Sequence, residues 1–446
     1  MLSFGTDGVR GVANADLTPE LALALGRASA RVLGGDAVVI GRDTRRSGPM
    51  LEAALAAGFA SEGVDVVLLG VVPTPAVAHA AAQLGVPGAM ISASHNPFPD
   101  NGIKLFAAGG RKLADDAETE LEAELAHLLG SGGGDRPTGA GVGTVRADDG
   151  AAVAAYEAHL LHAIGGRSLS GLSVVLDCAH GAASAIAPEV LRRAGVEVAV
   201  VHAEPDGVNI NDDAGSTAPG ALQQAVLDLG ADVGLALDGD ADRLLAIAAD
   251  GRVVDGDHVI AVLAIDRQAD GRLPHDTVVA TVMSNLGFKL GMDRRGIHVV
   301  STSVGDRYVL EAMERTGAAL GGEQSGHVIQ TDLATTGDGM LTALTLLDAV
   351  VRRGIPLDEL AADAMTSLPQ VLVNVRLDER DPELVERLAD DIAAADERLG
   401  DDGRVLVRPS GTEPLIRVMV EAPTEERARA EADALADAVR RLAGHA

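Results

Sequence analysis

The chain contains 446 residues and carries a formal net charge of −30 at neutral pH. This length exceeds what a single hydrophobic core supports, so we expect several domains. The negative charge excludes nonspecific attraction to nucleic acid or to an anionic membrane surface, because both carry the same sign.

The N-terminal segment MLSFGTDGVR has an early acid and no basic flank before an apolar core, so it is not typical of a secretory signal. No apolar run approaches the roughly 20 residues that cross a bilayer. We therefore expect a soluble, cytoplasmic protein. The single cysteine, Cys178, excludes an intramolecular disulfide and a thiolate metal cluster, and we interpret it as a core residue.

Short β-branched runs alternate with Ala- and Leu-rich stretches of helical period along most of the chain. The first pair is a predicted strand at residues 37–40 and a predicted helix at 50–61. Further strands are predicted at residues 64–69, 172–176, 196–201, 233–237, 277–282 and 298–300. This alternation indicates parallel sheets covered by helices.

Changes in this pattern predict the domain boundaries. The Gly-rich stretch 130–143 has no periodic apolar face and is predicted to be a linker. Helical spacing of apolar residues begins again at 253–265 and predicts a helix there. The pattern of apolar residues changes once more after Pro369. The predicted domains are residues 1–150, 151–253, 254–368 and 369–446.

The last domain is expected to be small and α+β. Its predicted elements are a strand at 371–375, a helix at 382–399, strands around Val405 and Val418, and a helix at 424–442.

The segment 91–104 (ISASHNPFPDNGIK) presents serines directly after a short apolar run. Pro97, Pro99 and the Asn101-Gly102 pair predict a turn immediately afterwards, which would place Ser94 at a strand end. On this segment alone, a capping or turn serine is the simpler interpretation.

A serine hydrolase is disfavoured at Ser94. His95 is poorly placed as a general base for its own neighbour, and no Gly-x-Ser-x-Gly elbow surrounds the serine. Lys104 is one of three lysines in the chain and could reach a phosphate or shuttle a proton.

The segment 237–243 (LDGDADR) places Asp238, Asp240 and Asp242 at every second position after an apolar run. Close carboxylates repel one another unless a cation offsets them, and carboxylates with phosphate or water oxygens suit Mg²⁺. A calcium EF-hand is rejected, since Arg243 would replace its required Gly and Ala249 its required Glu. A solvated Asp/Gly turn is the alternative.

Two further loops have compositions that suit an anionic sugar. The segment 408–417 (RPSGTEPLIR) flanks hydroxyl groups with two arginines, which can enclose a phosphate. The segment 321–327 (GGEQSGH) combines a carboxylate, a hydroxyl and an imidazole between glycines. Each could equally be an ordinary polar turn. No ATP-binding P-loop sequence is present, and a dinucleotide-binding fold finds little support.

Taken together and in this order, the four motifs resemble the α-D-phosphohexomutase superfamily along essentially the whole chain. The superfamily has a phosphoserine loop, a metal loop, a sugar loop and a phosphate loop in successive domains. The segments 4–11 (FGTDGVRG), 302–308 (TSVGDRY) and 336–339 (TGDG) favour its amino-sugar branch. Phosphomannomutases usually carry Met in place of Gln324. One departure is Ala241, where many relatives have glycine.

The resemblance implies an α/β fold with three similar α/β domains, whose mixed sheets are sandwiched by helices, and a smaller C-terminal α+β domain around a central cleft. It implies that Ser94 is a phosphoserine joined by Asp238, Asp240 and Asp242 around one Mg²⁺. The implied catalytic residues are Ser94, Lys104, Arg10, His95 and Arg243. The implied sugar contacts are Glu323, Ser325, His327, Thr302, Gly305 and Asp306. The implied phosphate contacts are Arg408, Ser410, Gly411, Thr412 and Arg417.

The implied activity converts glucosamine 6-phosphate into glucosamine 1-phosphate through a 1,6-bisphosphate, which feeds UDP-N-acetylglucosamine and cell-wall synthesis. Glucosamine or glucose 1,6-bisphosphate would serve as intermediate or activator. The implied partners are a small-molecule sugar phosphate, a second copy of the chain in a homodimer, and a kinase acting on Ser94 unless this serine is autophosphorylated. The same chemistry on glucose or mannose phosphates, a non-catalytic sugar-phosphate sensor and a phosphatase are the alternatives.

Overall fold

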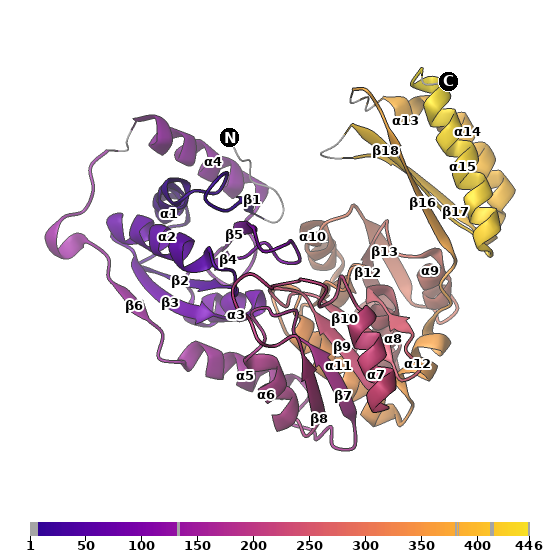
Figure 1. Ribbon diagram of the computed structural model, residues 1–446, viewed down its shortest axis with the longest axis horizontal. Helices are drawn as coiled ribbons and strands as arrows, with labels where there is room; N and C mark the ends of the chain where they lie inside the picture. Colours follow the sequence, from indigo (N-terminus) through magenta and orange to yellow (C-terminus); the bar gives the residue numbers. More distant parts are fainter. Residues whose placement is uncertain (1–7, 132–133, 380, 382, 411–413, 445–446) are drawn as a thin grey trace. The chain divides into compact units, whose positions relative to one another are not determined.

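The computed structural model describes residues 8–131, 134–379, 381, 383–410 and 414–444 (Figure 1). They belong to two compact units, one within residues 1–283 and 296–363 and the other within 284–295 and 364–446. In the described part of the chain, no helix is both long and apolar enough to cross a membrane.

The first region of the larger unit is built on a six-stranded mixed sheet in the order β1-β5-β4-β2-β3-β6. Its elements are β1 (Val9–Val12), α1 (Pro19–Leu33), β2 (Ala37–Arg42), α2 (Gly48–Ser61), β3 (Asp65–Val71), α3 (Thr74–Leu84), β4 (Gly88–Ile91), β5 (Asp100–Phe106), α4 (Asp115–Ser131) and β6 (Val145–Ala147). Helices α1, α2 and α4 share one hydrophobic core with the sheet, while α3 lies on the other face (Figure 1).

The second region has a five-stranded sheet in the order β11-β10-β9-β7-β8, in which β7 is parallel to β8 and β9, and β10 is antiparallel. Its elements are α5 (Ala151–Ala163), β7 (Ser173–Asp177), α6 (Ile186–Arg193), β8 (Glu197–Val201), α7 (Gly220–Leu229), β9 (Val233–Leu237), β10 (Leu244–Ala248) and β11 (Val253–Val254).

The third region has a four-stranded mixed sheet in the order β13-β12-β14-β15. Its elements in the larger unit are α8 (Gly256–Ala269), β12 (Thr277–Thr281), β13 (His298–Thr302), α10 (Asp306–Thr316), β14 (Leu320–Gly322), β15 (Val328–Gln330) and α11 (Gly339–Arg353), followed by α12 (Leu357–Ala364), which ends where the smaller unit begins.

The smaller unit is a three-stranded antiparallel sheet in the order β16-β18-β17 with its own hydrophobic core. Its elements are α9 (Leu286–Asp293), β16 (Gln370–Arg376), α13 (Leu384–Arg387), α14 (Ala389–Leu399), β17 (Arg404–Pro409), β18 (Leu415–Glu421) and α15 (Glu425–Leu442). The expected fold, three mixed α/β sheets and a smaller C-terminal part, is confirmed.

Three local predictions were wrong. The helix predicted at 253–265 begins only at Gly256, because Asp255 caps it by accepting from the His258 N–H at 3.2 Å, and Val253–Val254 form β11. The helix predicted at 382–399 is two helices that break at Leu388, and residue 382 lies outside the described residues.

The third error concerns the turn predicted at Asn101-Gly102. Both residues lie inside β5, where Gly102 pairs with Arg10 of β1. The Asn101 side chain is buried and donates to Ser47 Oγ at 2.9 Å, so it stabilises the strand instead of a turn. Lys104 is therefore a residue of β5.

Candidate active site

Ser94 lies in the loop that follows β4. Its side chain is buried, and its backbone adopts a left-handed φ of 51°. The hydroxyl donates to Asp238 Oδ2 at 2.6 Å and lies 3.3 Å from His95 Nδ1. The loop after β4 that contains Ser94 (the serine loop) therefore contacts the loop between β9 and β10 that contains Asp238 (the acidic loop).

Asp238, Asp240 and Asp242 occupy the turn between β9 and β10, and all three are buried. Each offers one carboxylate oxygen to a group whose members lie within 4.8 Å of one another. Lys104 Nζ lies 2.8 Å from Asp240 Oδ2 and 3.2 Å from Asp242 Oδ2. Lys104 thus pairs with two of the three carboxylates.

Two carboxylates of this cluster, those of Asp238 and Asp242, have pKa values shifted in opposite directions. Burial, together with the charges of Asp242 and Asp240, raises the pKa of Asp238 well above its usual range. Although burial also acts to raise the pKa of Asp242, Lys104 and His327 outweigh it and hold that pKa well below the usual range. The buried Asp240 Oδ1 has no hydrogen-bond partner among the described residues. An uncompensated buried carboxylate oxygen fits a cation, so the cluster could hold a metal ion.

Ala241, within the same turn, has a left-handed φ of 56° and is buried. Glycine adopts this conformation more easily than alanine. The structure therefore gives a physical reason why glycine would suit this position as well as alanine does.

A cavity of about 200 Å³ opens beside Ser94 and Asp242. Its lining comprises Arg10, Ser94, Asp242, Arg243, Val304, Gly305, Asp306, Glu323 and His327. Loops from all three regions of the larger unit thus contribute to one polar cavity.

His327 is buried between two carboxylates. Its Nδ1 lies 3.7 Å from Asp242 Oδ1, and its Nε2 lies 3.5 Å from Asp306 Oδ2. Although burial acts to lower the pKa of His327, the charges of Asp242 and Asp306 raise it above its usual value. A Cβ atom at Gly337 would come within 2.4 Å of the imidazole, so a glycine is required behind the ring.

The other predicted sugar contacts lie in different surroundings. Glu323 Oε1 accepts from the Gly305 N–H at 3.0 Å, which ties two loops of the cavity together. Thr302 donates its hydroxyl to the carbonyl of Ser303, Ser325 is exposed, and neither residue belongs to the cavity lining.

In the smaller unit, Arg408 of β17 and Arg417 of β18 are cross-strand neighbours. Burial and the charge of Arg417 lower the pKa of Arg408, as expected for two adjacent cations. The buried Arg417 Nε has no hydrogen-bond partner in the described part of the chain. Ser410, which directly follows β17, is buried, whereas Gly411 and Thr412 lie outside the described residues. This pair of guanidinium groups suits a phosphate.

Sequence reasoning missed several residues that support the site. Thr74 donates its hydroxyl to Asp240 Oδ2 at 2.7 Å, Lys112 forms an ion pair with Asp306, and Arg45 is buried under the Ser94 loop. The sequence does point to Arg45, because this residue follows a predicted parallel strand rich in β-branched residues. Parallel sheets bind ligands at the carboxyl ends of their strands.

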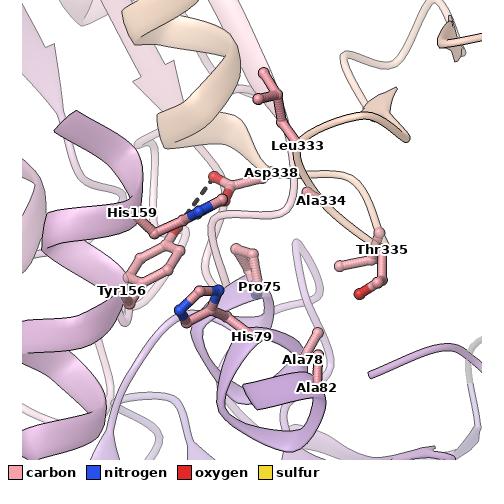
Figure 2. Close-up of a pocket in the computed structure, with 11 residues that line it drawn as sticks. Pro75, Ala78, His79, Ala82, Tyr156, His159, Leu333, Ala334, Thr335 and Asp338 are labelled. Carbon is pink, nitrogen blue, oxygen red and sulfur yellow. Dashed lines mark hydrogen bonds between the residues drawn. The ribbon is translucent and has the colours of Figure 1, made fainter. Parts of the chain in front are cut away.

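A second cavity, of about 90 Å³, lies where α3, α5 and the segment before α11 meet (Figure 2). There the Tyr156 hydroxyl points at Asp338 and lies 3.0 and 2.9 Å from its two carboxylate oxygens. The rings of His79 and His159 stack beside them with centroids 4.6 Å apart.

Four domain families match successive parts of the chain: phosphoglucomutase/phosphomannomutase alpha/beta/alpha domain I at residues 1–129, domain II at 154–251, domain III at 255–368 and the C-terminal domain at 372–438. Together with the three mixed sheets and the serine and acidic loops, these matches define the class of protein. The chain belongs to the phosphoglucomutase/phosphomannomutase family, the phosphohexomutases.

Individual relatives indicate which members of this family the chain resembles. A phosphoglucosamine mutase of Thermobifida fusca is 55% identical over 98% of this chain and 98% of its own. A family protein of known structure from Burkholderia thailandensis has a TM-score of 0.82 at 26% identity, covering 99% and 98% of the two chains. The N-acetylphosphoglucosamine mutase of Aspergillus fumigatus, solved with GlcNAc-6P and magnesium, shares the fold with a TM-score of 0.67 at 18% identity, covering 99% and 96%.

Proposed function

We propose that the chain is an isomerase that interconverts glucosamine 6-phosphate and glucosamine 1-phosphate. The observation that carries this proposal is the 2.6 Å hydrogen bond from the Ser94 hydroxyl to Asp238, beside a polar cavity. The identity to phosphoglucosamine mutases supports glucosamine as the sugar.

The reaction proceeds by two exchanges at one serine. In the first, the bond from phosphorus to Ser94 Oγ breaks while a bond to the C1 oxygen of glucosamine 6-phosphate forms, and the C1 hydroxyl proton is replaced by the phosphoryl group. The serine hydroxyl regains a proton, and the product is the 1,6-bisphosphate. After the sugar has turned over, the reverse exchange at C6 restores phosphoserine and leaves glucosamine 1-phosphate.

The acidic cluster is the proposed magnesium site, with Asp238, Asp240 and Asp242 as protein ligands and an oxygen of Ser94 as a fourth. When bound, Mg²⁺ would neutralise charge on a phosphoserine that carries about −1.5 to −2 at neutral pH. The A. fumigatus protein with magnesium supports the choice of ion.

The cations near Ser94 would stabilise the transferring phosphoryl group. Arg10 and Arg243 line the cavity, and Lys104 lies against the acidic cluster from the other region. His95 Nδ1 lies 3.3 Å from the serine hydroxyl, so it could exchange a proton with that group although it is the sequence neighbour of Ser94. Burial and the charge of Arg243 lower the pKa of His95, which favours its neutral form.

The remaining predicted residues would hold the sugar and its second phosphate. Glu323, His327, Gly305 and Asp306 border the cavity, which supports their role as sugar contacts. Thr302 and Ser325 do not line this cavity, so they would contact only a part of the substrate that extends beyond it. The phosphate that is not reacting would bind the arginine pair of β17 and β18 with Ser410, Gly411 and Thr412.

Glucosamine or glucose 1,6-bisphosphate is the proposed donor that charges Ser94 before the first turnover, with a kinase or autophosphorylation as the alternative source. A homodimer also stays a prediction. Glucose and mannose 6-phosphates are the competing substrates, and coupled assays on the three 6-phosphates would rank them.

The deciding experiment compares wild type with Ser94→Ala by intact mass and by the mutase assay. We expect a fraction of the wild-type chain to carry one added phosphoryl group. The variant should lack it and should retain less than about one thousandth of the activity, because the group that receives the phosphoryl is gone. Full activity in the variant would refute the mechanism, and release of inorganic phosphate at the rate of isomerisation would favour a phosphatase.

A further inference from the structure

Two backbone carbonyls of the Ser94 loop converge on the same pair of side chains. Arg45 Nη2 donates to the carbonyls of Ser94 and Asn96 at 2.9 and 2.8 Å. Asn211 Nδ2 donates to the same two carbonyls at 2.9 and 3.0 Å. The loop is thus held from two directions, by the first region through Arg45 and by the second through Asn211.

Arg45 is anchored inside the first region. It is fully buried, and its Nε lies 2.9 Å from Asp43 Oδ2. The same carboxylate oxygen accepts from Ser92 Oγ at 2.6 Å, and Ser92 Oγ accepts from the Ser94 N–H at 3.0 Å. Both backbone polar groups of Ser94 are therefore fixed.

Asn211 belongs to the segment between β8 and α7. Its backbone is itself left-handed, with a φ of 59°, and its N–H donates to the carbonyl of Ala179 at 2.9 Å. Asparagine tolerates this conformation better than most residues. Asn211 is therefore held by its own region while its amide reaches across to the serine loop.

The acidic loop packs directly on this contact. A Cβ atom at Gly239 would lie 2.6 Å from the Ser94 carbonyl oxygen and 2.9 Å from Asn211 Nδ2. Gly239 lies between two of the carboxylates, so the serine loop, the acidic loop and Asn211 meet at one point. A shift of the Ser94 carbonyl would disturb the distance between the serine hydroxyl and Asp238.

We propose that Asn211 is a positioning residue for phosphoryl transfer. By sharing the carbonyls of Ser94 and Asn96 with Arg45, its amide holds Ser94 in the strained left-handed conformation that directs the hydroxyl at Asp238. Such strain persists only where the surroundings enforce it. The inference rests on the proposed function, in which this hydroxyl carries the phosphoryl group.

The test compares wild type, Asn211→Gly and Asn211→Asp after each is charged with glucose 1,6-bisphosphate. Glycine keeps the left-handed backbone and removes the amide, whereas aspartate keeps the shape and cannot donate. We expect kcat to fall by about ten- to a hundredfold in both variants, because a small misplacement of a reacting group has this effect. KM for the sugar phosphate should stay within about twofold, since Asn211 does not belong to the cavity lining.

The phosphorus NMR resonance of the phosphoserine gives a second readout, and it should shift or broaden in both variants. Thr44→Val is the matched control. Its hydroxyl donates to the His180 carbonyl at 2.7 Å, which is another contact between the same two regions but not to the serine loop. This control should keep the kcat and the resonance of wild type.

A wild-type kcat and resonance in Asn211→Gly would overturn the inference, and so would an equal fall in kcat in Thr44→Val. A wild type without mutase turnover would instead refute the proposed function. In that case the phosphorus resonance would still decide whether Asn211 positions Ser94.

Discussion

Lys104 is a buried cation that faces the acidic cluster from a different region of the larger unit. Its ion pairs with Asp240 and Asp242 offset part of a charge that would otherwise be confined in a low dielectric. The lysine therefore stabilises the cluster before any metal binds.

We predict that Lys104→Met will lower the free energy of unfolding of the metal-free protein by about 3 kcal/mol, because two buried carboxylates lose their partner. Adding Mg²⁺ should raise the thermal midpoint of this variant by more than it raises that of wild type. Calorimetry with chelator and with Mg²⁺ measures both effects. Lys289→Met, which changes a lysine of α9, is the control, and equal Mg²⁺ shifts in all three proteins would contradict the prediction.

At the scale of single residues, the sequence predicted those functional groups that lie close together along the chain. The alternating carboxylates were visible as a metal motif, and they are a buried cluster. Thr74 and Asn211 could not be found in this way, because their partners in the site lie far away in the sequence. The contact between Asn211 and Ser94, for example, joins residues 117 positions apart.

Asp338 begins helix α11 and connects it to α5. Its carboxylate caps the helix by accepting from the Leu341 N–H at 2.9 Å and also accepts from the Tyr156 hydroxyl. Burial raises the pKa of Asp338 to about 6. The folded protein therefore binds a proton at this carboxylate more readily than the unfolded chain does.

The raised pKa of Asp338 determines the direction in which the stability of the folded protein changes with pH. The stability that protonated Asp338 contributes is fully present below about pH 4 and is lost as pH rises through about 6. Relative to wild type, Asp338→Asn should gain about 3 kcal/mol between pH 4 and 7. Thermal midpoints of both proteins across this range test the prediction, and a difference that does not change with pH would refute it.

In the smaller unit, Glu421 connects the sheet to α9. Its buried carboxylate accepts from Arg404 Nε at 3.1 Å, from Arg404 Nη2 at 2.9 Å and from the Leu286 N–H at 2.8 Å. Arg404 also donates to the Ser284 carbonyl. One ion pair therefore holds the start of a helix that is far away in the sequence.

We predict that Glu421→Gln will destabilise the smaller unit by about 2 kcal/mol, because a buried hydrogen-bonded charge pair is broken. Glu431→Gln is a matched control, since it changes the pair between Glu431 and the half-exposed Arg398 of α14. Its effect on the thermal midpoint should be clearly smaller. Equal shifts in the two variants would contradict the role of Glu421.

At the scale of elements, strongly periodic segments were predicted well, and their ends were not. The strand predicted at 233–237 is β9, with the same limits. The start of α8 depended on the side-chain cap at Asp255, and the break at Leu388 lies within a continuous helical pattern. Such features depend on individual hydrogen bonds that a pattern of apolar residues does not contain.

The chain passes between its two compact units at residues 283–284, 295–296 and 363–364. Helix α9 belongs to the smaller unit although it lies between β12 and β13 in the sequence. Periodicity alone could not assign this helix, because its partner Glu421 lies far along the chain.

If the sugar turns over between two exchanges at Ser94, as proposed, movement of the unit that carries the arginine pair would favour this step. We predict that solution scattering of Ser94→Ala, in which we expect no turnover, will show a smaller radius of gyration with glucosamine 1-phosphate than without it. Inorganic sulfate at equal ionic strength serves as the control. Superimposable profiles would contradict this closure.

The contact between Tyr156 and Asp338 also has an optical consequence. The chain has no tryptophan and two tyrosines, Tyr156 and Tyr308, both within the larger unit. Tyrosine emission therefore follows the larger unit alone, whereas the peptide circular dichroism follows both. Because the Tyr156 ring bears a hydroxyl that rests on a carboxylate, its fluorescence should brighten when α5 separates from α11, which gives an unlabelled signal for the unfolding of that junction.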